Sequence, residues 1–249
     1  MFRPLILTLF VVANATILRA EEVTVAVAAN FAAPMQKIAQ LFQQDTGHMA
    51  RLSFGATGSF YAQIKNGAPF QIFLSADATT AEKLEAEGLG LAGTRFTYAT
   101  GQLVLWSPQP ELVDEKGRIL QRKEIQRIAM ANPKIAPYGA AAMETITHLG
   151  LLKDLQSKLV LGDNIAQTYQ FVMTQNVPIG FVSLSQVFIN GKIGTGSAWI
   201  VPAHYYKPLR QEAILLKNAK DHSAAKALML YLRGEKARVV MKSFGYLTE

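Results

Sequence analysis

The stretch FGATGSFYAQI, residues Phe54 to Ile64, decides the fold. It reads as the end of a strand, a glycine-rich turn and the start of a helix. Small and hydroxyl residues stand where the helix begins, and the stretch contains no charged residue. Such a turn exposes backbone N–H groups at the positive end of a helix dipole, which together can hold an oxyanion. The sequence therefore suggests that uncharged groups bind a small tetrahedral oxyanion here.

The same arrangement recurs at three other places in the chain. A strand is followed by small or amide residues and then by a helix at Asn30, at Pro137-Tyr138 and at Asn164-Ile165. Open parallel sheets bind ligands at the carboxyl ends of their strands, so the four helix N-termini could share one ligand. Any one of these turns alone is more commonly a plain helix cap, so the hypothesis rests on the four together. Two turns lie in each half of the chain, which predicts two lobes with a cleft between them.

The order of elements predicts an α/β fold. Apolar strands are expected at residues 23–29, 50–54 and 71–75, and a helix with one apolar face follows the first of them. A β-α-β-α-β-α order implies a mainly parallel sheet flanked by helices. In the second half, strands are expected within residues 102–106, 125–130, 159–161, 179–183, 198–201 and 212–216.

Composition narrows the class of protein. The chain has 249 residues, of which 50% are hydrophobic and 17% charged, so it can bury a substantial core and is not of the disordered type. It contains no cysteine, which excludes a disulfide framework, a thiolate metal site and a cysteine nucleophile. The net charge is +7, but apart from residues 118–127 the basic residues form no cluster, so nucleic-acid binding is not predicted.

Residues 1–20 have the features of a secretory signal peptide. Arg3 stands near the start, an apolar run extends from Leu5 to Val12, and Ala20 precedes two acidic residues. The run is too short to span a bilayer comfortably, and no later run is long enough. We expect a mature protein exported to the periplasm. An uncleaved N-terminal anchor is the alternative.

The sequence favours binding over catalysis. A buried dianion costs several kcal/mol unless hydrogen bonds replace its water, and neutral donors can do this without a cation. Lys134 is the nearest charged residue to the third turn, and the carboxylates Asp77 and Asp163 are interpreted as helix-starting residues. No phosphate-binding loop, nucleophile elbow or dinucleotide fingerprint is present. We expect no enzyme activity, no cofactor and no direct metal ligands, because the four histidines lack metal-binding spacing: His48, His148, His204 and His222.

Five stretches, taken together, resemble one family. The chain is similar to the periplasmic molybdate-binding proteins of ABC importers, and the similarity covers nearly all of it after the leader. The resemblance implies a two-lobed, type II periplasmic-binding-protein-like fold with the ligand cleft between the lobes. The stretches, in family order, are VAVAANF (25–31), FGATGS (54–59), GAPFQIFLSAD (67–77), NPKIAPYG (132–139) and PIGFV (178–182).

The resemblance also implies which residues contact the anion. These are Asn30, Thr57, Tyr138 and Ile165. Some family members place a tyrosine hydroxyl just after the strand at 180–182, where this chain has Ser183, so that position is not included. We expect one lobe to comprise residues 21–100 and 208–249 and the other residues 101–207.

The implied function is that of the substrate-binding component of a molybdate importer. It would bind molybdate or tungstate as a monomer and deliver it to the permease in the inner membrane. A receptor for sulfate or another tetrahedral oxyanion is the alternative, since sulfate carries the same charge. An enzyme on the same fold, such as a porphobilinogen polymeriser, needs a cysteine for its cofactor, and this chain has none. A transcription-factor effector domain would need a DNA-binding module, where this chain has a leader.

Overall fold

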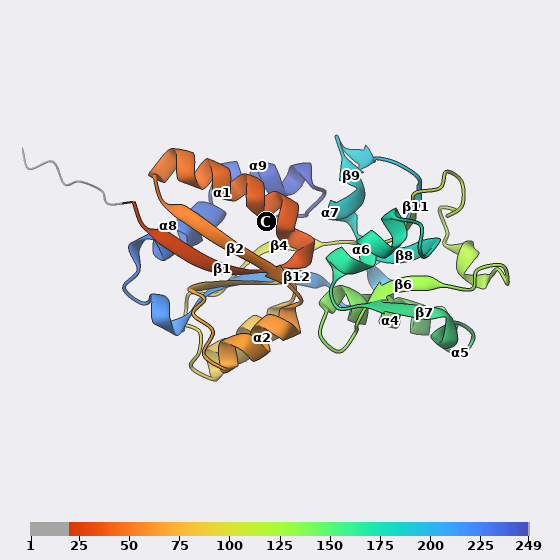
Figure 1. Cartoon of the computed structure of the whole chain (residues 1–249), viewed down its shortest axis with the longest axis horizontal. Coiled ribbons are helices and arrows are strands. Elements are labelled where there is room, and N and C mark those ends of the chain that lie inside the picture. Colours follow the sequence, from red (N-terminus) through yellow and green to blue (C-terminus); the bar gives the residue numbers. More distant parts are fainter. Residues whose placement is uncertain (1–19, 249) are drawn as a thin grey trace, which may run out of the picture.

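The computed structural model describes residues 20–248, which form two groups of helices and strands side by side (Figure 1). Each group is built on a five-stranded sheet. The predicted signal peptide lies, except for Ala20, outside the described residues. Within residues 20–248, no helix is long and apolar enough to cross a membrane.

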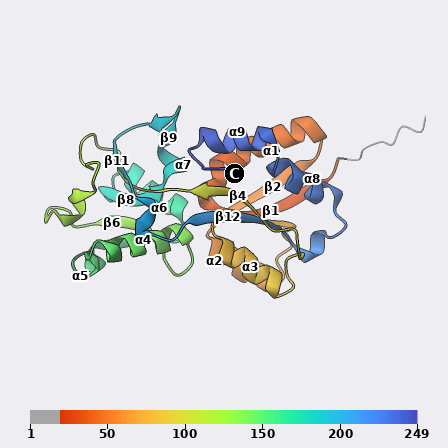
Figure 2. The same cartoon turned by 180° about the vertical axis from the view of Figure 1, so that it is seen from behind.

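The first sheet has the strand order β2-β1-β3-β12-β4. Helices α1, α8 and α9 cover one face, and α2 and α3 cover the other (Figures 1 and 2). The strands are β1 (Glu22–Ala28), β2 (Met49–Gly55), β3 (Ile72–Ser75), β4 (Phe96–Gly101) and β12 (Leu209–Leu215). The helices are η1 (Ala29–Phe31), α1 (Ala32–Thr46), α2 (Thr57–Lys65), α3 (Ala78–Ala86), α8 (Ser223–Leu232) and α9 (Glu235–Ser243).

The second sheet has the strand order β11-β5-β8-β6-β7. A short hairpin, β9 and β10, projects beside it. The strands are β5 (Leu103–Ser107), β6 (Ile128–Ala131), β7 (Leu159–Gly162), β8 (Ile179–Ser183), β9 (Phe188–Ile189), β10 (Lys192–Ile193) and β11 (Ser197–Ile200). The helices are α4 (Pro137–His148), α5 (Leu152–Leu155), α6 (Ile165–Met173) and α7 (Leu184–Val187).

Both sheets are mainly parallel, as the sequence predicts. In the first, β12 pairs antiparallel with β3 and with β4, so it alone runs against the other four strands. In the second, β5 pairs antiparallel with β8 and with β11 and is likewise the one reversed strand. The two reversed strands are those that follow the two crossings of the chain between the sheets, around residue 102 and over residues 201–208. We propose the lobe limits 21–100 with 208–249, and 101–207, on this ground.

The side chains of β1 show why the strands read as continuous apolar runs. Val23, Val25 and Val27 belong to the cluster beneath α1, α8 and α9, whereas Ala26 belongs to the cluster beneath α2 and α3. Successive strand residues point to opposite faces, and here both faces are covered by helices. The strand is therefore apolar at nearly every position, and its carboxyl end is held rigidly where η1 begins.

Two local predictions were wrong. Strand β4 was not predicted, because its threonines Thr97 and Thr100 break the apolar pattern at the edge of the sheet. The sequence TTAE (79–82) has the spacing of a capping box and predicts a helix that begins there, but α3 begins at Ala78. Asp77 is its N-cap, with Oδ1 accepting from the Thr80 N–H at 2.7 Å, so the interpretation of Asp77 as a helix-starting residue is confirmed.

Candidate functional site

The structure brings Asn30, Thr57, Tyr138 and Ile165 together around one small cavity. The cavity is small, about 10 Å³, and lies between the two sheets, at the carboxyl ends of their strands. Each lobe contributes segments to its wall, as is expected if the four helix N-termini share one ligand. The lining residues are Ala28, Ala29, Asn30, Gly55, Ala56, Thr57, Ala76, Ala136, Pro137, Tyr138, Asn164 and Ile165.

At the start of α2, Thr57 offers the cavity two hydrogen-bond donors. The N-cap is Ala56, which has no side chain that could cap the helix, and the Thr57 N–H has no partner among residues 20–248. The Thr57 Oγ1 accepts a bond from the Ala76 N–H at 3.0 Å. Because a hydroxyl has one hydrogen and two lone pairs, this bond orients the group and leaves its hydrogen to donate. Gly58 is different, since its N–H donates to Ile135 O across the cleft at 2.8 Å.

At the start of α4, Tyr138 offers a single backbone donor. Pro137 occupies the first position of the helix, as predicted, and has no N–H. The N–H groups of Gly139 and Ala140 both donate to Ala136 O, at 2.9 and 3.1 Å. That leaves the Tyr138 N–H, for which the described part of the chain supplies no acceptor.

At the start of α6, Ile165 plays the same part. Asn164 Oδ1 accepts from the N–H groups of Ala166 and Gln167, at 2.9 and 3.0 Å. The Ile165 N–H is left without a partner among the described residues. The expectation that Asp163 starts this helix was wrong, because Asn164 is the N-cap and the Asp163 N–H donates to Gln167 Oε1 at 2.6 Å.

Asn30 contributes its backbone, because its side chain is already engaged. Its Nδ2 donates to Gln211 Oε1 at 2.8 Å and to the Tyr246 hydroxyl at 3.0 Å, which uses both amide hydrogens. Its N–H, in η1, has no acceptor within residues 20–248. The Tyr138 hydroxyl likewise accepts from Gln211 Nε2 at 3.2 Å. The polar ends of both side chains therefore belong to a buried cluster beside the cavity.

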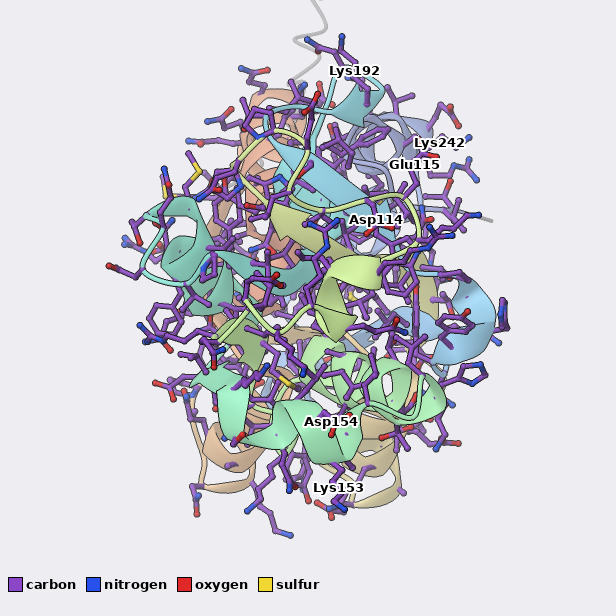
Figure 3. The ribbon with its side chains drawn as sticks, turned by 90° about the vertical axis from the view of Figure 1, so that its right-hand side faces the viewer. Asp114, Glu115, Lys153, Asp154, Lys192 and Lys242 are labelled. Carbon is purple, nitrogen blue, oxygen red and sulfur yellow. The ribbon has the colours of Figure 1, made fainter. Side chains whose placement is uncertain are left out.

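No charged side chain lines the cavity among the residues described. Lys134 is exposed and is not part of the wall. Charged side chains lie on the outer surface, as at the far end of the second lobe, where Figure 3 labels Lys153 and Asp154 on α5 and Lys192 on the β9–β10 hairpin. The wall of the cavity can therefore bind an anion only through N–H groups, a hydroxyl and the dipoles of helices. Each helix dipole is worth about 0.3–1 kcal/mol.

The tyrosines beside the cavity are also uncharged. Burial raises the pKa of Tyr138 well above its usual value, and it does the same to the pKa of Tyr98. Burial likewise raises the pKa of Tyr246. Their hydroxyls stay protonated at neutral pH and do not repel an anion.

Several residues of this region were not found from the sequence. Ala76 lines the cavity, while Tyr98, Ser185, Gln211 and Tyr246 form the buried cluster beside it. Ala76 lies within the matched stretch 67–77, whereas the cluster residues stand in segments with no turn signature. Ser183 is buried, and its Oγ lies 2.8 Å from the Ser185 Oγ. It is not part of the cavity wall.

Comparison with known proteins agrees with this geometry. A family model described as bacterial extracellular solute-binding protein matches residues 23–247. The chain belongs to this solute-binding family. Molybdate-binding protein ModA of Azotobacter vinelandii is 55% identical over 92% of this chain and 90% of its own length. The corresponding protein of Rhodobacter capsulatus is 48% identical over 92% of this chain and 90% of its own length.

A solved structure gives the same result for the fold. The periplasmic molybdate-binding protein of Azotobacter vinelandii superposes with a TM-score of 0.88, at 40% sequence identity, covering 91% of this chain and 99% of that protein. The predicted two-lobed periplasmic-binding-protein-like fold is thereby confirmed. These relatives are named for binding a solute and not for a reaction.

Proposed function

We propose that this protein is the substrate-binding component of a molybdate ABC importer. It binds molybdate or tungstate in the cavity between the lobes, and it delivers the anion to an inner-membrane permease. It acts as a periplasmic monomer, without catalysis and without a cofactor. One observation carries the proposal: the cavity has no charged lining residue among those described, and four of its lining residues have N–H groups without an acceptor there, one of them with a hydroxyl as well.

The donor set favours a fully ionised oxyanion. A dianion such as molybdate carries no hydrogen, so it needs no acceptor from the protein. It can accept a hydrogen bond from every donor in the site. A protonated oxyanion brings a hydroxyl hydrogen that finds no acceptor in such a site, and an unmade buried bond costs about 1–3 kcal/mol. The proposed contacts are the N–H groups of Asn30, Thr57, Tyr138 and Ile165, together with the Thr57 hydroxyl.

The choice of molybdate over sulfate rests on similarity. Both anions are dianions, so charge does not separate them. The relatives that are 55% and 48% identical over 92% of this chain are both named molybdate-binding proteins.

Titration calorimetry with molybdate, tungstate and sulfate tests the proposal. We expect molybdate and tungstate to bind with similar affinity and sulfate to bind far more weakly. Ligand at about a hundred times its dissociation constant should also raise the free energy of unfolding by about 2.7 kcal/mol. Sulfate binding as tightly as molybdate would contradict the assigned specificity.

The position of the first strand supports export with cleavage after Ala20. Strand β1 begins at Glu22, and the Glu21 carbonyl already accepts from the Met49 N–H at 2.9 Å. Cleavage after Ala20 therefore leaves the first sheet intact. Mass spectrometry of the protein from a periplasmic extract should give a mature N-terminus at Glu21, and a chain that retains Met1 would contradict the proposed export.

A further inference from the structure

A buried group of polar side chains adjoins the cavity and joins the two lobes. We call it the Gln211 cluster. All of its members are buried, and the residues come from both lobes, since Ser183, Ser185 and Tyr138 belong to the second. Its members are Asn30, Tyr98, Tyr138, Ser183, Ser185, Gln211 and Tyr246.

The carboxamide of Gln211 connects the lobes because it acts as acceptor and donor at once. Its Oε1 accepts from Asn30 Nδ2 at 2.8 Å and from the Tyr98 hydroxyl at 2.9 Å, both in the first lobe. Its Nε2 donates to the Tyr138 hydroxyl, in the second lobe, at 3.2 Å. Two of these partners, Asn30 and Tyr138, also line the cavity, whereas Gln211 does not.

The backbone at both crossings is arranged around this side chain. Gln211 follows the second crossing, and the pairing of β12 with β4 shifts at Gln211 and Glu212, which leaves Tyr98 opposite neither of them. At the first crossing, a Cβ on Gly101 would lie 2.6 Å from Gln211 Nε2 and would also collide with the Tyr138 hydroxyl. Only glycine at this position lets the two side chains meet.

Asn30 is held from the second lobe as well. The Ser185 Oγ donates to Asn30 O at 2.8 Å, and the Tyr246 hydroxyl lies 2.8 Å from the same carbonyl oxygen. The side chain and the carbonyl of Asn30 are thus both fixed, so its N–H is presented to the cavity in one orientation.

We propose that Gln211 is a positioning residue of the anion site, which places the Asn30 and Tyr138 N–H groups together only when the lobes are closed. This inference rests on the proposed function. Gln211 acts through its two partners and does not touch the anion. An amide is required, because leucine makes neither bond and glutamate supplies acceptors alone.

This role has a kinetic signature. An anion first meets one lobe, and the lobes then close, so the Gln211 bonds form after the encounter. Loss of the amide should therefore raise the dissociation rate and leave the association rate unchanged, as is usual for interactions made only in the final complex. A general loss of stability would not produce this split.

The first test compares Gln211→Leu with Gln102→Leu by titration calorimetry and stopped-flow kinetics with molybdate. Gln102 is the control, because it lies at the first crossing and its Nε2 donates to Gly245 O at 3.2 Å, with no side-chain bond to Asn30 or Tyr138. We expect Gln211→Leu to bind molybdate about tenfold more weakly, through faster dissociation, and the control to bind within about twofold of the unmodified protein. Equal affinities of Gln211→Leu and the unmodified protein would overturn the inference.

A double-mutant cycle adds a readout specific to the bond between the lobes. Tyr138→Phe removes the hydroxyl that Gln211 bonds but keeps the backbone N–H that the anion uses. We expect the double variant to bind no more weakly than Gln211→Leu alone, because both changes break the same connection. Losses that multiply would overturn the inference.

The same measurements separate this inference from the proposed function. If the unmodified protein binds none of molybdate, tungstate and sulfate, the proposed function fails and the inference fails with it. If the unmodified protein binds molybdate but the dissociation rate of Tyr138→Phe is unchanged, the inference alone fails. The dissociation rate of Tyr138→Phe therefore tests the inference even if Gln211→Leu does not fold.

Discussion

The cavity and the Gln211 cluster lie next to each other, and both are buried. Neither contains a charged side chain among the described residues. They differ in how their hydrogen-bonding groups are paired. In the cluster, each side-chain nitrogen or oxygen named above has at least one hydrogen-bond partner, and the buried unpaired side-chain atoms found within residues 20–248, Arg238 Nε and Thr248 Oγ1, lie elsewhere. Around the cavity, by contrast, donors lack acceptors. An unpaired buried donor costs about 1–3 kcal/mol, so a surplus of donors marks the place where a ligand supplies the acceptors.

Asn30 and Tyr138 belong to both regions. Their side chains are satisfied in the cluster, whereas their N–H groups face the cavity without a partner. The comparison therefore separates two roles within one residue, and substitutions that disturb both regions should have larger effects than those that disturb one.

The largest effect is expected for Asn30→Leu. It leaves Gln211 Oε1 with one donor fewer, deprives Tyr246 of a partner and disturbs the N–H that we propose as an anion contact. We expect molybdate to bind about a hundredfold more weakly, by titration calorimetry, since two buried bonds are affected. Asn66→Leu, whose amide donates to Ala62 O on the surface, is the control. Normal binding by Asn30→Leu would mean that the anion occupies another place.

Thr57→Val disturbs the cavity alone. It removes the hydroxyl donor and leaves the Ala76 N–H without its acceptor. A hydrogen bond to a charged group is worth about 1.5–3 kcal/mol, so the affinity for molybdate should fall by at least about tenfold. Thr145→Val is the matched control, because this buried hydroxyl donates within α4 to Ala141 O. Equal affinities of the two variants would remove Thr57 from the site.

Gly58→Ala tests contact between the lobes outside both regions. A Cβ on Gly58 would lie 3.0 Å from Ile135 Cα and 3.1 Å from Ile135 O, so the lobes would have to separate slightly. We expect molybdate affinity to fall about threefold to tenfold, measured by titration. Gly234→Ala introduces a Cβ 3.1 Å from Tyr231 O, within one lobe, and should not change binding. The same result for both variants would indicate that closure does not depend on this contact.

The smallest effect is expected from pH. Burial raises the pKa of Tyr138 and of Tyr98 well above the usual value of about 10, so molybdate affinity should be flat from about pH 6 to pH 9. Above about pH 10 the unfolded chain releases these protons while the folded protein keeps them, so the free energy of unfolding should fall as pH rises. Titrations and urea unfolding at several pH values measure both. A loss of affinity between pH 7 and pH 9 would indicate a titrating group in the cavity.

The cavity was accessible to prediction from the sequence, and the cluster was not. Each turn at Asn30, Thr57, Tyr138 and Ile165 has a local signature of strand, small residues and helix, and parallel sheets bring such turns to one edge. Gln211 and Tyr246 have no local signature, because their burial depends on where the chain crosses between the lobes. Tyr138 is buried and its hydroxyl accepts from Gln211, and neither fact follows from the local turn.

The local errors have a common cause. Strand β4 was missed because an edge strand interrupted by Thr97 and Thr100 lacks a continuous apolar run. The start of α3 and the role of Asp163 were misjudged because neighbouring Asp, Asn and Thr residues compete to cap a helix, and the sequence does not rank them. The lobe limits remain a prediction, and the experiments above test the anion contacts.

The uncharged wall of the cavity has a consequence for the release of cargo. A lysine or arginine in that wall would be left behind as a lone buried charge each time the anion departed, at a cost of several kcal/mol. Amide and hydroxyl groups can instead be rehydrated by ordinary water as the lobes part. Such a protein can bind its anion tightly while the lobes are closed and release it quickly when they open. The rate of delivery is then set by the opening motion.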